Sequence, residues 1–168
     1  MTISELLADA FGRIREVVVE VLEGLEPGDL DERVDPGANS IAWLVWHLAR
    51  VQDDHVAAAA GVEQRWTAGG WSKRFALALD EADIGYGHDD EQVAAVSAGG
   101  ELLLGYYDAV HEATLRYVAG LTDADLDRVV DERWDPPVTL GVRLVSVIAD
   151  DLQHAGQAAY VKGIVQRR

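Results

Sequence analysis

Apolar residues recur every three or four positions through several long segments of this chain, and this spacing limits its fold more than any other feature. The clearest segment runs from residue 3 to about Gly24. Its apolar positions are Ile3, Leu6, Leu7, Ala10, Ile14, Val17, Val18, Val21 and Leu22. Such spacing places side chains on one face of an α-helix. No segment alternates apolar and polar residues as a half-buried strand would, so the sequence predicts an all-α fold.

Capping and breaking residues divide the chain into four predicted helices, with approximate ranges 3–24, 40–61, 90–120 and 139–168. Asn39 or Ser40 supplies an N-cap for the second helix, and Gly61 ends it. Gly99 and Gly100 weaken the middle of the third helix, which we still expect to run through them. The sequence therefore predicts a four-helix bundle, with residues 1–168 forming a single domain.

The connection between the second and third helices, residues 62–90, is long and rich in glycine. Only residues 72–79 have the pattern of a short helix. Loops longer than about 12–15 residues inside a compact domain are frequently functional. We therefore expect this crossover loop to shape a binding pocket.

The chain also contains a candidate internal repeat. The segment LEGLEPGDLDERVD at 22–35 aligns with VAGLTDADLDRVVD at 118–131. Each copy ends one predicted helix and leads into another, which suggests two similar halves related by a pseudo-twofold axis. That arrangement would place the helices at 40–61 and 139–168 side by side. The alternative is that this motif is effective helix-stop and capping chemistry used twice.

Composition argues against several classes of protein. The formal net charge is −16, from 30 acidic and 14 basic residues, and it would repel both nucleic acid and anionic membranes. No segment reaches the roughly 20 uncharged apolar residues that span a bilayer, and the first residues do not resemble a secretory leader. We expect a soluble cytoplasmic protein. The chain has no cysteine, so any thiol chemistry needs a thiol that arrives as a ligand.

Three side chains on the second and fourth predicted helices form a candidate metal site. Asp150 and His154 are four residues apart and share a helix face, while His47 lies near the middle of the other helix. Three protein ligands leave one position open, as in catalytic metal sites. A lone histidine on an apolar face is more often a core residue, and an Asp–His pair can be a helix-surface hydrogen bond. The combination of all three favours a metal site.

Two further residues share faces with the triad. Asp54 follows His47 by seven positions, and Arg143 precedes Asp150 by seven. We expect both to bind polar groups of a thiol or substrate, although an ion pair at the helix start is an equal alternative for Arg143.

Other polar or aromatic residues near the triad receive structural interpretations. His55 is rotated by about 80 degrees from His47 on an ideal helix, which favours a surface or loop-facing position. Asp151 is a candidate to replace Asp150 as a ligand, or else it supports a ligand by hydrogen bonding or lies at the surface. Core packing, with a share in the pocket wall, is expected for Trp43 and Trp46. No functional role is assigned to His88 and His111.

The WHL string at His47, the D-x-x-x-H-A-G-Q-A string at 150–158 and the four-helix layout resemble the DinB-like superfamily. The resemblance is to the actinobacterial members grouped with the amino-terminal domain of mycothiol-dependent maleylpyruvate isomerase, and it extends over nearly the whole chain. It implies a divalent metal, commonly zinc or nickel, bound by His47, Asp150 and His154. Family members more often have histidine or glutamate where this chain has Asp150, and a shorter carboxylate favours harder ions, so the metal stays open.

The resemblance also implies an activity. Characterised relatives are thiol S-transferases and isomerases in which mycothiol or bacillithiol binds the open metal position, loses its proton and attacks an electrophile. The isomerases carry a further carboxy-terminal domain with no counterpart in residues 1–168, which favours a simple transferase. The alternative is a non-catalytic metal- or small-ligand-binding stress-response bundle. The resemblance also allows a homodimer, for which the apolar stripe of residues 3–24 offers one surface.

Overall fold

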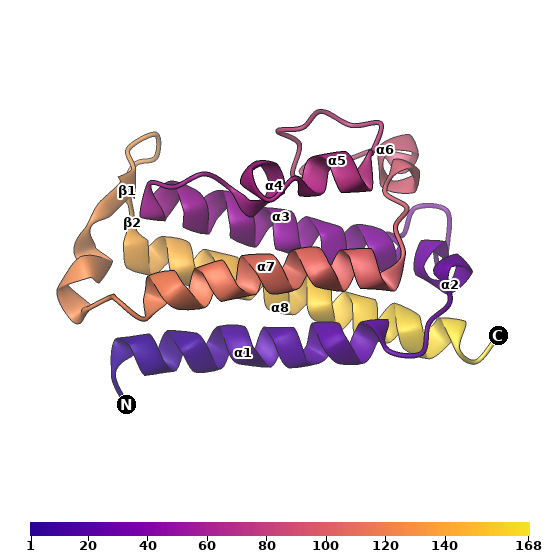
Figure 1. Cartoon of the computed structure of the whole chain (residues 1–168), viewed down its shortest axis with the longest axis horizontal. Helices are drawn as coiled ribbons and strands as arrows, with labels where there is room; N and C mark the ends of the chain where they lie inside the picture. Colours follow the sequence, from indigo (N-terminus) through magenta and orange to yellow (C-terminus); the bar gives the residue numbers. More distant parts are fainter.

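The computed structural model describes all 168 residues and shows four long helices packed into a bundle (Figure 1). The long helices are α1 (Ile3–Leu22), α3 (Ile41–Ala60), α7 (Gly100–Val118) and α8 (Leu140–Val165). Shorter elements are α2 (Pro27–Asp31), α4 (Arg65–Ala68), α5 (Trp71–Phe75), α6 (Asp90–Ala95), the 3-10 helix η1 (Asp123–Asp127), β1 (Val129–Asp131) and β2 (Val138–Thr139). The predicted all-α bundle, with a long crossover between α3 and α7, is confirmed.

Side-chain caps set the ends of three long helices close to the predicted positions. Thr2 and Glu5 form a capping box at the start of α1. The Ser40 hydroxyl accepts a hydrogen bond from the Trp43 amide at 3.1 Å, and Gly61 ends α3 in the left-handed conformation that glycine tolerates best. The Thr139 hydroxyl caps α8.

Two local predictions were wrong and one was partly right. The third predicted helix is divided into α6 and α7, because the chain turns at residues 96–99 and buries Val96 in the core. The short helix expected at 72–79 corresponds to α5, which ends earlier, at Phe75, and the crossover loop holds a second short helix, α4, that was not expected. The strands β1 and β2 form a small antiparallel hairpin before α8, and they are too short to produce a visible alternating pattern.

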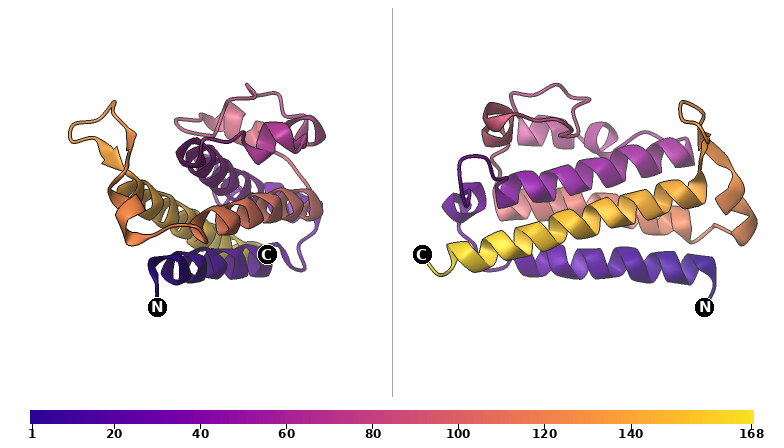
Figure 2. Two further views of the ribbon diagram at one scale, coloured as in Figure 1. Left: turned by 60° about the vertical axis from the view of Figure 1, so that its left-hand side comes forward. Right: turned by 180° about the vertical axis from the view of Figure 1, so that it is seen from behind.

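The two halves of the candidate repeat adopt corresponding structures. The short helices α2 and η1 occupy equivalent positions, and each has a capping box, from Glu26 and Asp29 in one and from Thr122 and Asp125 in the other. Helices α3 and α8 follow these turns and pack against each other more extensively than any other pair of helices. The two views of Figure 2 show them side by side. The repeat interpretation therefore placed the two candidate ligand-bearing helices side by side as observed.

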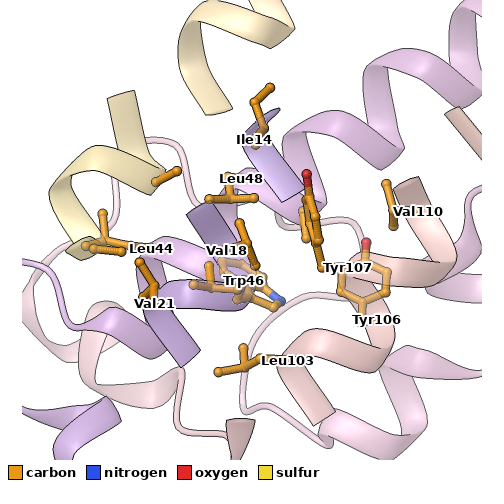
Figure 3. Packing of buried hydrophobic residues seen from close by; sticks show 14 of the residues in the cluster. Ile14, Val18, Val21, Leu44, Trp46, Leu48, Leu103, Tyr106, Tyr107 and Val110 are labelled. Atoms are coloured by element: carbon orange, nitrogen blue, oxygen red, sulfur yellow. The ribbon is translucent and has the colours of Figure 1, made fainter. Parts of the chain in front are cut away.

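The core draws apolar side chains from all four long helices (Figure 3). Ile14 and Val18 come from α1, Leu48 from α3, and Leu103 and Tyr107 from α7. Helix α3 is the most enclosed, because every residue from 41 to 53 is buried. A polar side chain in the middle of α3 is consequently held away from bulk water. No helix is both long enough and apolar enough to cross a membrane.

Candidate metal site

The structure brings His47, Asp150 and His154 together between α3 and α8. One potential ligand atom from each residue lies within 4.8 Å of the others. The Nε2 atom of His47 is 3.9 Å from Oδ2 of Asp150, and Nε2 of His154 is 3.7 Å from Oδ1 of the same carboxylate. This His–Asp–His group could bind a divalent metal ion.

Hydrogen bonds at the other ring nitrogens orient both imidazoles. Nδ1 of His47 contacts the backbone carbonyl of Ile84, and Nδ1 of His154 lies 2.9 Å from Oε1 of Gln157. Both partners are acceptors, so each Nδ1 carries the proton and each Nε2 presents a lone pair. The two lone pairs are therefore available on the side where Asp150 lies.

Burial shifts the pKa values of His47 and Asp150. His47 is 2% exposed, and its burial lowers its pKa to about 4, so the ring is neutral at pH 7. Burial raises the pKa of Asp150, whose Oδ2 atom has no hydrogen-bond partner. A buried carboxylate oxygen without a partner is destabilising, and a bound cation would satisfy it. The residues present thus fit a divalent ion with nitrogen and oxygen ligands, the donor set that zinc and related ions accept.

The segment Asp83–His88, which we call the strap, crosses over His47. Gly85 within it has a φ of 99°, and a Cβ built there would lie 2.5 Å from Nδ1 of His47. Only glycine satisfies both the backbone conformation and this close approach. The approach is what lets the neighbouring Ile84 carbonyl reach the ring.

Polar contacts fasten the strap to α3. The indole of Trp43 on α3 donates to Nδ1 of His88 at 3.0 Å, and within the strap Nε2 of the same ring lies 2.9 Å from Oδ2 of Asp83. The guanidinium of Arg50 donates to the Asp83 carbonyl at 3.2 Å. No role was expected for His88 from the sequence, in which Gly85 and Gly87 are the only signal of this anchoring.

Aromatic rings enclose the candidate site on two sides. Trp43 stacks on His47 with centroids 4.6 Å apart and planes inclined by 15°. Tyr86, at the exposed side, presents its ring edge-on to His47 at 5.3 Å. The core packing predicted for Trp43 is confirmed by its burial, while its share in a pocket wall stays a prediction. The position of Tyr86 beside His47 was not expected from the sequence.

Arg143 and Asp54 are engaged with protein groups. Nη2 of Arg143 donates to Asp131 at 3.0 Å, so the ion-pair alternative for Arg143 describes this contact, and its Nη1 approaches His55. Asp54 accepts a hydrogen bond from Gln64 at 2.8 Å. His55 lies between them and is partly buried, with 20% of its side chain exposed. The predicted binding of thiol or substrate by Arg143 and Asp54 stays a prediction.

Asp151 has no exposed surface, which rules out the surface position considered for it. Neither of its carboxylate oxygens has a hydrogen-bond partner, and burial raises its pKa well above the usual range. It points into the core and lies outside the His47, Asp150 and His154 group. Burial therefore favours the protonated, neutral form of the Asp151 side chain in the core.

The fold and this group define a four-helix bundle with histidine and aspartate side chains converging between two helices. Residues 10–158 match the profile of the DinB superfamily, and the chain belongs to that superfamily. A crystal structure of a conserved protein from Enterococcus faecalis is similar over 100% of this chain and 99% of that chain, with 32% identity and a TM-score of 0.92. No curated protein sequence matches this chain.

Proposed function

We propose that this protein is a divalent-metal-dependent transferase that conjugates a low-molecular-weight thiol to a small electrophile. The observation that carries the proposal is the convergence of two imidazole lone pairs on a partly buried carboxylate with one buried, unpartnered oxygen. Membership of the DinB superfamily supports the scaffold. The thiol is inferred to be mycothiol-like, and the ion zinc or nickel, from the resemblance of the segments around His47 and His154.

The residues of the chain have separate tasks in this proposal. A cation held by His47, Asp150 and His154 supplies Lewis-acid chemistry that lowers the pKa of a coordinated thiol. Trp43 and the strap exclude water from the inner side of the site. Tyr86 borders the outer side, where the co-substrates enter. Burial raises the pKa of Tyr86, the nearby charge of Asp150 raises it further, and the charge of Arg143 opposes this shift. The chain supplies no cysteine, so the sulfur nucleophile comes from the co-substrate.

Metal analysis tests the first half of the proposal. Protein purified without a polyhistidine tag should contain about one equivalent of a divalent ion, which His154→Ala should lose. Gln153→Ala, a change at the adjacent exposed position of α8, is the matched control and should keep the ion. Absence of metal from all three proteins, even after excess ion is added back, would rule out the proposal.

Turnover tests the second half. Loss of free thiol in the presence of a model electrophile such as a chloronitrobenzene should require both the metal and His154. Tight metal binding without any turnover across a panel of thiols and electrophiles would support the non-catalytic alternative, a metal-binding bundle, and would exclude the transferase.

A further inference from the structure

Tyr86 is held at the candidate metal site by a short segment of unusual backbone. Its neighbours Gly85 and Gly87 have φ values of 99° and 74°, a region that residues with side chains rarely adopt. The resulting turn sets the Tyr86 ring against His47, with centroids 5.3 Å apart and planes inclined by 83°. The two glycines therefore position the tyrosine beside a candidate ligand.

The Tyr86 side chain does not hold the strap in place. The hydrogen bonds that fasten the strap to α3 involve Asp83, Ile84 and His88. Tyr86 is 60% exposed, so it does not fill the core either. A tyrosine combines an apolar ring with a polar hydroxyl that can bind a partner. Tyr86 is thus positioned precisely while its hydroxyl is free for a ligand.

Other side-chain donors beside the strap are already in use within the chain. Nδ1 of His47 donates to a backbone carbonyl, and the indole of Trp43 donates to an imidazole of the strap. The guanidinium of Arg143 donates to Asp131 at 3.0 Å. The phenol of Tyr86 is therefore the donor that remains on this side of the site.

The charges around Tyr86 indicate where its hydroxyl lies. Burial raises the pKa of this phenol, and the charge of Asp150 raises it further. Coulomb interactions weaken with distance, so the hydroxyl lies close enough to Asp150 for the two groups to interact. His47 is 2% exposed, so a ligand that approaches it from solvent contacts the more exposed Tyr86 first. A phenol is protonated at neutral pH and presents a hydrogen-bond donor to that ligand.

A hydrogen-bond donor matters most where negative charge develops during a reaction. When a thiolate adds to an α,β-unsaturated carbonyl compound, a bond forms between sulfur and the β-carbon, and the π electrons of the C=C bond move onto the carbonyl oxygen. The α-carbon then takes up a proton that replaces the one the thiol lost to solvent, so nothing leaves and nothing is oxidised or reduced. A donor already aimed at that oxygen stabilises the transition state more than the ground state.

The acidic surroundings make such a donor necessary. Asp150, Asp151 and Asp54 all raise the pKa of Tyr86 through their charges, which shows that they lie near its hydroxyl. The same charges disfavour negative charge on a substrate oxygen at this position. A direct hydrogen bond from Tyr86 would offset that repulsion.

We propose that the Tyr86 hydroxyl donates a hydrogen bond to the carbonyl oxygen of the electrophile, and that the electrophile is an α,β-unsaturated carbonyl compound. This inference rests on the transferase function proposed above. Tyr86 is then a catalytic residue, because it touches the reacting group, and Gly85 and Gly87 are the residues that position it.

Binding of unreactive ligands tests the contact without turnover. The thioether of mercaptoethanol and cyclohexenone keeps the carbonyl oxygen, whereas cyclohexyl hydroxyethyl sulfide lacks it. Calorimetry of the metal-loaded wild type should show tighter binding of the ketone by about three- to tenfold, the range that one hydrogen bond contributes. Tyr86→Phe should lose this preference and keep its metal.

Tyr160→Phe is the matched control for the binding comparison. Tyr160 is 68% exposed and lies on α8, and its substitution should leave the preference for the ketone unchanged. Equal affinities of the wild type for the two thioethers, or a preference that survives in Tyr86→Phe, would overturn the proposal.

Turnover tests the catalytic consequence. With cyclohexenone as the electrophile, Tyr86→Phe should lower kcat/KM by about a hundredfold, as removal of a donor to a developing oxyanion does. With benzyl bromide, which has no oxygen, the same variant should change kcat/KM by less than about twofold. Equal losses with both electrophiles would exclude the catalytic role. Absence of turnover with every electrophile would refute the transferase itself, and the binding comparison would then decide separately whether Tyr86 binds a carbonyl group.

Discussion

The two helices that form the candidate metal site hold their ligands in different ways. On α3, His47 is 2% exposed, and its ring is oriented by the Ile84 carbonyl, 37 positions away along the chain. On α8, the side chains of Asp150 and His154 are 24% and 18% exposed, and His154 is oriented by Gln157 on its own helix. One ligand therefore depends on tertiary structure and the other two mainly on helix geometry. Substitutions around His47 and substitutions on α8 should therefore differ in their effects on stability and on metal binding.

The largest effect is expected at the strap. Gly85→Ala should lower the free energy of unfolding by about 3 kcal/mol, because left-handed backbone costs an L-residue about 1–2 kcal/mol and overpacking adds a similar amount. It should also abolish metal binding by displacing His47. Gly87→Ala is the control, since its φ is 74° but an added Cβ there meets nothing within 4 Å. It should cost about 1 kcal/mol. If urea denaturation showed equal losses of stability for Gly85→Ala and Gly87→Ala, the close contact between Gly85 and His47 would not contribute to stability.

Alanine substitutions compare the two sides directly. In metal-free protein, His47→Ala should reduce stability by about 2–3 kcal/mol, because a buried ring stacked on Trp43 is removed. His154→Ala should change it by less than about 1 kcal/mol, because the side chain is partly exposed. Both variants should lose the metal. Thermal and urea unfolding after chelation would distinguish them, and a greater loss for His154→Ala would contradict the comparison.

The stability of the metal-free protein should depend on pH through the protonation of His47. Burial lowers its pKa from 6.5 to about 4, so between these values the unfolded chain binds a proton that the folded chain does not. The contribution is complete above pH 6.5 and is lost as the pH falls towards 4, with a slope of up to about 1.4 kcal/mol per pH unit. His47→Gln should have a shallower dependence in this window. If the stability of the wild type and of His47→Gln changed in parallel with pH, a group other than His47 would be responsible for the pH dependence.

The smallest effect is expected from Gln157→Ala. Removing the acceptor at Nδ1 of His154 should weaken metal affinity about tenfold, at the low end of the effects reported for such supporting groups. Stability without metal should change by less than about 0.5 kcal/mol. Titration calorimetry with Gln153→Ala as the control would measure this. An affinity equal to that of the control would mean that helix geometry alone orients His154.

Features local to one helix could be predicted from the sequence. Ser40 and Gly61 mark the ends of α3, and the spacing of Asp150 and His154 placed both on one face. The repeat added the proximity of α3 and α8, which brought His47 into the group. The metal-ligand assignment itself stays a prediction.

Features that depend on contacts between distant residues could not be predicted. The turn at residues 96–99 exists because Val96 enters the core, and the strap follows its course because Gly85 fits against His47. Asp151 is buried by its neighbours on other helices despite being charged in isolation. In each case the local sequence pattern does not indicate which residues of other segments will pack against the residue.

The repeat has a consequence for how many ions the bundle can hold. An offset of 96 positions relates Gly24 to Gly120, and the same offset relates Asp54 to Asp150 and His47 to Arg143. A symmetric scaffold would duplicate any ion site across its axis. At the duplicate position, however, a guanidinium stands where the imidazole would be, and it donates hydrogen bonds but cannot coordinate a cation. One half of the molecule thus has side chains that could hold a cation from solution, while the corresponding position of the other half carries the covalently attached charge of Arg143.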